Sequence, residues 1–290
     1  MKNKKVTAAG IALISAITML VCSCRSNREQ TPAKVISTTK SDCKEAPNIN
    51  SVTPNEPPSS IPDAPTVLSP SPVKLPKYDD PESYLKYDPE NDTYIPTDEE
   101  KRLGEESLFV GDSICSGFSA WGVLESKNVF AMGNVAAWSL LDYDMYYRNK
   151  PAKLVPVLKK AKPKRVFFWM GMNDVNMTSA EQYCENYKKI IDLTLENSDA
   201  DVYVCAITPI SDLKFTRLDY INEFNDAIKH YIMRNYEERV HFVSFADPLK
   251  TPDGLLNDEY NGGDGIHLGK KAYFIALHEL NKQIKKANLP

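Results

Sequence analysis

The chain has 290 residues, of which 42% are apolar and 26% charged, and its formal net charge is −4. A negative net charge argues against a nucleic-acid-binding protein, and no basic stripe is expected along the chain. Six cysteines at uneven spacing, without a Cys-x-x-Cys pair, predict neither a disulfide framework nor a zinc site. The four histidines show no metal-ligand spacing and no phosphate-cradling glycine loop occurs, so we expect no metal or cofactor.

The first 23 residues have the pattern of an export signal. Lysines at positions 2, 4 and 5 precede an uncharged apolar run over residues 6–21. This run is short for a membrane-spanning helix and suits the apolar region of a signal peptide. We therefore expect residues 1–23 to direct export.

A cysteine pair follows the apolar run directly. Cys24, preceded by Ser23, resembles the lipidation site of bacterial lipoproteins. That resemblance implies a lipidated Cys24 as the mature N-terminus, on the outer face of a bacterial cell membrane. Cys22, preceded by Val21, is the alternative, and an ordinary cleaved signal with two incidental cysteines is another.

Residues 24–77 are predicted to be a disordered tether. From residue 25 on they contain no aromatic residue and no glycine, and proline, serine and threonine are abundant. A segment without aromatics buries too little apolar surface to offset its ordering entropy. Such a tether would reach roughly 40 Å even as a flexible coil.

Residues 78–99 alternate tyrosines with acids and prolines, and this pattern predicts a strap that lies on the folded domain. The domain itself is expected over residues 100–290, a usual size for a single domain.

Within the domain, short apolar runs alternate with amphipathic segments. Near-continuous apolar runs indicate parallel strands that are covered on both faces. The predicted strands are Ser107–Val110, Asn128–Met132, Arg165–Met170, Asp201–Ile207 and Val240–Phe245. Helices are expected from a capping box at Thr178 to Leu195, around Ile221 to Tyr231, and over Lys270 to Lys286. About five such alternations predict a doubly wound α/β sandwich.

Residues with chemical potential follow the ends of these strands. The segments are Gly111-Asp112-Ser113, Gly133-Asn134, Gly171-Met172-Asn173-Asp174, and the late turn that holds Asp264 and His267. Ligands bind beyond the carboxyl ends of strands in such sheets, so we expect these segments to meet. Ser113 would be the nucleophile, His267 its general base and Asp264 the group that orients the imidazole. The backbone N–H groups of Ser113 and Gly133 and the Asn173 amide would hold the oxyanion.

These four segments resemble the four sequence blocks of the SGNH, or GDSL-type, hydrolases. The resemblance covers about residue 108 to the end of the chain, and the one departure is Ile114 where leucine is common. It implies a flavodoxin-like α/β/α fold, ester hydrolysis by a Ser113–His267–Asp264 triad, and an oxyanion hole of Ser113, Gly133 and Asn173. The Gly-x-Ser-x-Gly design of other serine hydrolases is not met, because Cys115 stands at its fifth position.

Other conspicuous residues have plainer interpretations. Cys115 is expected to pack in the core and Asp174 to stabilise its loop. His278 is predicted to be a solvated helix residue, as is His230. Core packing is favoured over lining an acyl pocket for three tryptophans, at positions 121, 138 and 169.

We therefore expect an exported, membrane-anchored serine esterase, acting as a monomer, that removes acetyl or other short acyl groups from a glycan. The glycan rests on the expected location and on no residue. A lipid acylhydrolase or thioesterase, with a groove near Val135 and Trp138, is one alternative. A surface-binding lipoprotein without activity is another, of a different class.

Overall fold

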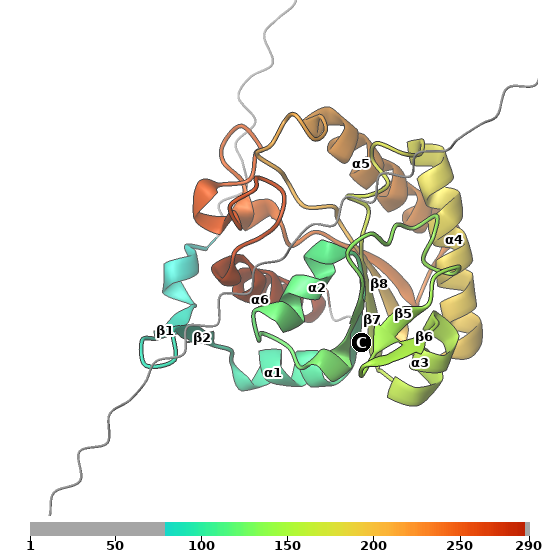
Figure 1. The fold of residues 1–290 in the computed structure, drawn as a ribbon, viewed down its shortest axis with the longest axis horizontal. Coiled ribbons are helices and arrows are strands. Elements are labelled where there is room, and N and C mark those ends of the chain that lie inside the picture. Colours follow the sequence, from blue (N-terminus) through green and yellow to red (C-terminus); the bar gives the residue numbers. More distant parts are fainter. Residues whose placement is uncertain (1–78, 288–290) are drawn as a thin grey trace, which may run out of the picture. The chain divides into compact units, whose positions relative to one another are not determined.

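The computed structural model describes residues 79–287 (Figure 1). The predictions for residues 1–23, for Cys22 and Cys24, and for the tether lie outside this range. Within it, no helix combines the length and apolar character needed to cross a membrane. One continuous hydrophobic core extends from Leu103 to Ile284. With about 200 residues and a core of its own, this part of the chain has the properties of an independently folding domain.

A five-stranded parallel sheet forms the centre of the domain. Its strands are β3 Ser107–Gly111, β4 Val129–Ala131, β7 Arg165–Trp169, β8 Asp201–Cys205 and β9 Val240–Val243, in the order β4-β3-β7-β8-β9. The sequence places apolar side chains on both strand faces, as burial under two helical layers requires. The predicted strands and the flavodoxin-like α/β/α fold are confirmed. Four of the predicted strands extend beyond the observed ends by one or two residues.

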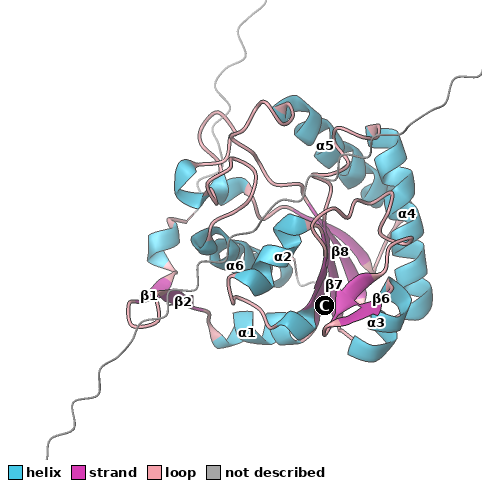
Figure 2. Cartoon of the chain, viewed as in Figure 1, coloured by secondary structure: helices cyan, strands magenta, loops and turns pink. Residues whose placement is uncertain are grey.

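Helices cover both faces of the sheet (Figure 2). They are α1 Asp98–Glu105, α2 Ser113–Ala120, α3 Leu154–Ala161, α4 Ala180–Asn197, α5 Leu218–Asn235 and α6 Lys270–Lys286. Helices α1, α2 and α6 pack together on one face, and α3, α4 and α5 on the other. The predicted start of α4 is one residue early, because Ser179 and not Thr178 is the N-cap and accepts the Gln182 N–H.

Two short hairpins were not predicted from the sequence. Strands β1 Lys86–Asp88 and β2 Thr93–Ile95 form one, and β5 Met145–Tyr147 and β6 Lys150–Ala152 form the other. Strands of three residues are too short to show a period-two pattern. The β5–β6 turn has positive φ at both central residues, Arg148 and Asn149, as a type I′ turn requires.

Segment 79–99 contacts helix α6 through opposite charges. Three of its acids pair with α6 lysines: Asp79 with Lys282, Glu82 with Lys271, and Asp92 with Lys270; in α1, Glu99 pairs with Lys285. Each pair is exposed on at least one side and contributes little by itself. Together they neutralise the lysines along one face of α6.

His278 lies beneath this segment, and its prediction as a solvated residue is wrong. Its Nδ1 lies 2.6 Å from a carboxylate oxygen of Glu100, and the Tyr84 ring stacks on the imidazole at 3.8 Å. Glu100 also closes a capping box with Thr97 at the start of α1. The charged neighbours of His278 are therefore bonded partners rather than a sign of solvent.

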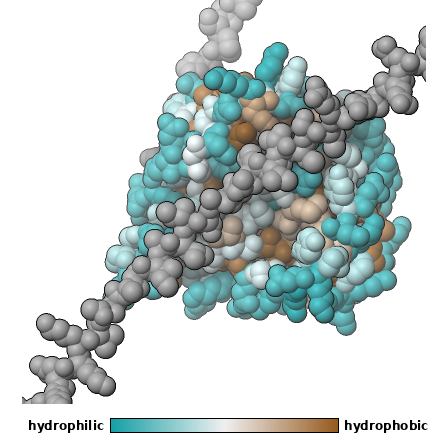
Figure 3. All heavy atoms as spheres, in the orientation of Figure 1, coloured by the Kyte–Doolittle hydropathy of each residue, from teal (hydrophilic) through white to brown (hydrophobic). Residues whose placement is uncertain are grey.

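The expectation that no basic stripe exists is also wrong. Residues 145–173 contain eight lysines and arginines and no aspartate or glutamate, although residues 79–290 as a whole hold 25 cations and 34 acids. The eight cations lie on the β5–β6 hairpin, on α3 and on the connection to β7. The face seen in Figure 3 is largely hydrophilic at its margins, with smaller apolar patches between.

Candidate active site

Ser113 is the first residue of α2, directly after strand β3. The Asp112 carboxylate caps this helix by accepting the Ile114 N–H at 2.9 Å. A Cβ at Gly111 would lie 1.9 Å from the Trp169 carbonyl oxygen, so glycine is required where β3 passes β7. The tight strand-to-helix turn therefore presents Ser113 at a helix N-terminus, where backbone N–H groups favour negative charge.

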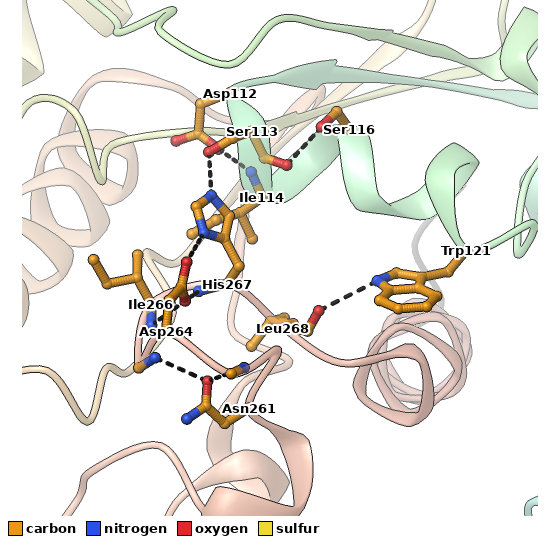
Figure 4. A network of polar contacts seen from close by, with 12 residues as sticks. Asp112, Ser113, Ile114, Ser116, Trp121, Asn261, Asp264, Ile266, His267 and Leu268 are labelled. Atoms are coloured by element: carbon orange, nitrogen blue, oxygen red, sulfur yellow. Dashed lines mark hydrogen bonds and ion pairs between the residues drawn. The ribbon is translucent and has the colours of Figure 1, made fainter. Parts of the chain in front are cut away.

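The late turn brings an acid and an imidazole to this serine (Figure 4). The Nε2 atom of His267 lies 2.8 Å from Ser113 Oγ, and its Nδ1 atom lies 2.6 Å from an oxygen of Asp264. The other Asp264 oxygen accepts the backbone N–H groups of Ile266 and His267. A continuous hydrogen-bonded chain thus joins Asp264, His267 and Ser113. The serine and the acid lie 151 residues apart in the sequence.

Asp264 stays ionised over a wide pH range. Burial alone would raise the pKa of this carboxyl, but hydrogen bonds from the His267 side chain and from two backbone N–H groups outweigh it and lower the pKa to about 2. The side chains of Asp264 and His267 are 52% and 45% exposed. The pair is therefore ordered by its own turn and open to solvent.

Three contacts that sequence reasoning missed hold this turn. The Asn261 side-chain oxygen accepts the N–H groups of Gly263 and Gly265, each at 2.9 Å. The Gly265 carbonyl accepts the N–H groups of Ser211 and Asp212 from the loop after β8. The signal for Asn261 was its place in Asn261-Gly262-Gly263, a sequence typical of tight turns.

The third contact comes from Trp121, whose indole N–H donates to the Leu268 carbonyl at 3.3 Å. Trp121 and Trp138 are 43% and 45% exposed, so the prediction that they pack in the core is wrong. Trp169 is buried, as predicted, and so is Cys115. Both exposed tryptophans lie in turns that follow the motif segments in the sequence.

Gly133, after β4, and Asn173, after β7, come from the two strands that flank β3, and they contact each other. The Asn173 amide donates to the carbonyl oxygens of Val135 at 2.8 Å and of Gly133 at 3.2 Å. A Cβ at Gly133 would meet no atom within 4 Å, so packing of the described residues does not demand glycine there. The structure brings the loops after β4 and β7 together, as expected from the sequence.

The side chain of Asp174 holds the loop after β4 by a hydrogen bond. Its carboxylate accepts the Ala137 N–H at 2.9 Å. Burial raises the pKa of this carboxyl to about 7, and the charge of Asp112 adds to the shift; burial likewise raises the pKa of Asp112 to about 6. Two buried carboxyl groups therefore support the backbone around the site.

A hydroxyl, an imidazole and a carboxylate in this order can activate a serine for attack on a carbonyl carbon. Helix N-terminal N–H groups and an amide nearby can stabilise the resulting oxyanion. Among residues 79–287, no group of three or more histidine, cysteine or acidic side chains could hold a metal ion. The arrangement suits acyl transfer without a metal ligand set in this part of the chain.

Comparison with known proteins gives a family match and several similar structures. Residues 109–275 match the model of the GDSL-like lipase/acylhydrolase family. No curated protein matches the chain. A GDSL-like lipase from Bacteroides thetaiotaomicron VPI-5482 is 19% identical over 66% of this chain and 91% of its own, with a TM-score of 0.49. A family two carbohydrate esterase from Clostridium thermocellum, solved with cellohexaose, is 16% identical over 62% of this chain and 63% of its own, with a TM-score of 0.42.

Proposed function

The chain belongs to the GDSL-like lipase/acylhydrolase family and is a carboxylic ester hydrolase, and on that premise we propose that Ser113, His267 and Asp264 form its catalytic triad. The observation that carries the proposal is the hydrogen-bonded chain from Asp264 through His267 to Ser113 Oγ. The contact between His267 Nε2 and Ser113 Oγ, at 2.8 Å, is within the distance that a general base requires, and the 2.6 Å contact to Asp264 orients the imidazole.

In the proposed reaction, Ser113 Oγ attacks the ester carbonyl carbon while its proton passes to His267 Nε2. The tetrahedral intermediate collapses as the bond to the alcohol oxygen breaks, and the alcohol leaves with the proton from Nε2. Water then attacks the acyl-enzyme with the same histidine as base, releasing the carboxylic acid and restoring Ser113. Asp264 holds the imidazole and stabilises its charged form.

The oxyanion is proposed to be held by the N–H groups of Ser113 and Gly133 and by the Asn173 amide. The longer of the two Asn173 contacts, to the Gly133 carbonyl at 3.2 Å, is the one that the oxyanion would replace. Such donors are worth most when they are already oriented before charge develops.

The proposed substrate is a short acyl ester, above all acetate, on a glycan. The exposure of Asp264 and His267, near one half each, supports a bulky alcohol component that approaches an open surface. The exposed rings of Trp121 and Trp138 offer flat apolar surface, and Trp121 is joined to the turn of His267 through the Leu268 carbonyl. A lipid acylhydrolase or thioesterase remains the second candidate, since Trp138 and the buried Val135 belong to one loop.

The proposed location is the outer face of a bacterial cell membrane, with Cys24 lipidated and residues 24–77 as tether to a monomeric domain. Replacing Cys24 with alanine should release the protein from the membrane fraction into the medium. Retention of a Cys24→Ala protein that is released by Cys22→Ala would instead assign the lipid to Cys22.

The function is tested with purified residues 25–290 and the matched Ser113→Ala variant. We expect acetate release from acetylated xylan or O-acetylated peptidoglycan, and labelling by a fluorophosphonate, both abolished in the variant. Labelling without acetate release, together with faster cleavage of longer acyl chains, would favour the lipid substrate. A protein that neither turns over p-nitrophenyl acetate nor takes the label would contradict the proposed triad.

A further inference from the structure

Residues 79–287 present two basic faces, and acids within this range form ion pairs with only one of them. The lysines of α6 pair with acids of segment 79–99, as described above. The second face consists of Arg148, Lys150, Lys159, Lys160 and Lys162, which we call the hairpin–α3 face. All five are exposed, and within residues 79–287 none of them forms an ion pair with a carboxylate.

Two of the five cations lie over the ring of Tyr147, and the others adjoin them on the hairpin or along α3. The guanidinium of Arg148 lies 5.4 Å from the centre of this ring and the Lys160 ammonium 5.9 Å. Lys150 pairs with Tyr147 across the hairpin. Arg148 and Lys162 line one cavity of about 230 Å³, and Lys159 and Lys162 line a second of about 390 Å³. The cations therefore form one surface rather than five separate charges.

Neighbouring acids offset only part of the positive charge of this surface. Glu106 is engaged by Lys164 at 2.7 Å and by Arg165 at 3.3 Å, and Glu125 by Lys127 at 3.0 Å. Glu105 and Asp199 line the same two cavities. Since residues 145–173 supply eight cations and no acid to an otherwise acidic domain, the local charge is strongly positive.

Two of these cations occupy backbone positions that favour other residues. Arg148 has φ +50° in the hairpin turn, and Lys162 has φ +46° at the C-terminal end of α3. Asparagine or glycine is preferred at both kinds of position, because side chains with a larger Cβ substituent are strained there. The sequence therefore places charge at two sites where local structure alone would favour an uncharged residue.

We propose that the hairpin–α3 face docks on the surface of an anionic phospholipid bilayer. A patch of four to eight lysines and arginines near a membrane binds acidic headgroups through their negative surface potential. Tyr146, 64% exposed on the same hairpin, supplies the amphipathic ring that is enriched at membrane–water interfaces. A headgroup layer thus fits this combination better than a soluble polyanion, which needs charge alone.

The position of the face suits such docking. Lys162 precedes β7, and the hairpin–α3 face lies toward the amino ends of the strands, while Ser113 follows the carboxyl end of β3. A domain held by this face would keep its catalytic edge turned away from the bilayer. Docking is independent of the catalytic proposal, and it adds an electrostatic contact to the proposed lipid anchor, in line with the need for two signals in stable anchoring.

The test is co-sedimentation of unlipidated residues 25–290 with vesicles of 70% phosphatidylcholine and 30% phosphatidylglycerol. The variant Arg148→Asn, Lys159→Gln, Lys160→Gln, Lys162→Asn removes four charges and relieves both positive-φ positions, so it should be at least as stable as the parent. We expect its partitioning to fall on the order of a hundredfold or more, at roughly fivefold per charge.

A matched control removes four exposed cations elsewhere: Lys86, Lys189, Lys229 and Arg234, each to Gln. It has the same net charge and should keep most of the binding. Parent binding should weaken from 50 to 300 mM salt and vanish on pure phosphatidylcholine. All three proteins should hydrolyse p-nitrophenyl acetate equally, so a failure of docking would leave the catalytic proposal untouched.

Three results would overturn the proposal. One is an absence of parent binding to the anionic vesicles at 50 mM salt. Another is an equal loss in the variant and the control, which would assign binding to net charge. The third is binding of soluble polyphosphate, but not of vesicles, through the same four residues; this would identify a soluble polyanion as the partner instead of a bilayer.

Discussion

The chain contains two carboxylate–imidazole pairs with the same geometry and different surroundings. Asp264 contacts His267 Nδ1 at 2.6 Å, and Glu100 contacts His278 Nδ1 at the same distance. The first pair is about half exposed, whereas the Glu100 and His278 side chains are 8% and 22% exposed. His267 directs its second ring nitrogen to a serine hydroxyl, and the ring of His278 is covered by Tyr84.

This difference shows that a carboxylate bound to a histidine does not define a catalytic pair. Both acids have a pKa below the ordinary value, because hydrogen bonds outweigh the opposing effect of burial. What separates the pairs is the neighbour of the free imidazole nitrogen and its access to a substrate. The free nitrogen of His267 thus faces a serine hydroxyl, as the proposed triad requires, while the Glu100–His278 pair lies against Tyr84 of segment 79–99.

The largest difference is expected from removing each imidazole. His267→Ala should lower the rate of ester hydrolysis on the order of a millionfold, because the triad acts as a unit. His278→Ala should leave the rate within a few-fold of the parent. Both rates are measured with p-nitrophenyl acetate; comparable losses in the two variants would erase the functional distinction between the pairs.

Replacing each acid by its amide should give a smaller contrast in the same direction. Asp264→Asn should cost about ten-thousandfold in kcat, since the amide favours the wrong imidazole tautomer. Glu100→Gln should change kcat little and act on stability instead. Steady-state kinetics of both variants, with thermal melting as a check on folding, distinguishes these outcomes.

The catalytic pair needs an oxyanion partner that the structural pair lacks. Asn173→Ala should lower kcat by roughly a hundred- to a thousandfold, with a smaller change in KM. Full activity in this variant would remove the asparagine from the proposed mechanism. Gly133→Ala tests whether substrate occupies the space beside this residue. A Cβ there meets no protein atom within 4 Å, so stability should be unchanged, while a clash with substrate should raise KM.

For the free energy of unfolding, the Glu100–His278 pair should matter more than the Asp264–His267 pair. His278→Ala leaves the Glu100 carboxylate buried without its imidazole and should lower the free energy of unfolding by about 2 kcal/mol. The folded-state pKa of Glu100 is below its ordinary value, so its contribution is present above that value and lost as pH falls through the lowered pKa. Urea unfolding at pH 7 and pH 4 measures both effects; the penalty should shrink in acid.

The buried carboxyl group of Asp174 has no imidazole partner, and stability should depend on its ionisation in the direction opposite to that of Glu100. Burial raises the pKa of Asp174 to about 7, so its favourable neutral form is lost as pH rises through that value. The unfolded chain ionises near pH 4 and the folded protein near pH 7, so stability should fall by about 1 kcal/mol for each pH unit between these values and level off above pH 7. Asp174→Asn should flatten this decline between pH 4 and 7, measured by urea unfolding; an unchanged slope would assign it to another group.

Sequence patterns predicted the local parts of this molecule better than its long-range contacts. The five strands are apolar runs that differ from their surroundings. Asp264 and His267, which join Ser113 in one hydrogen-bonded chain, belong to one short motif segment. Glu100 and His278 lie 178 residues apart, so nothing local to either residue indicated the pair. The exposure of Trp121 and Trp138 was likewise mispredicted, because loop residues beside a site need not follow the burial preference of their type.

The β1–β2 and β5–β6 hairpins escaped prediction for another reason. Three residues per strand give too short a pattern, and the second hairpin turns on Arg148-Asn149 rather than on the usual Asn-Gly. Asn261 was overlooked because its role depends on accepting two backbone N–H groups of a turn whose shape the sequence does not give.

The ion pairs between segment 79–99 and α6 have a mechanical consequence. Load applied to the chain at Asp79 enters the domain through contacts with α6, first at Lys282, then at Lys271 through Glu82 and at His278 through Tyr84. These contacts lie along the helix and would open one after another before tension reaches the sheet. Under the proposed anchoring, a pull on the tether would therefore load these contacts before it reaches the Ser113–His267 contact.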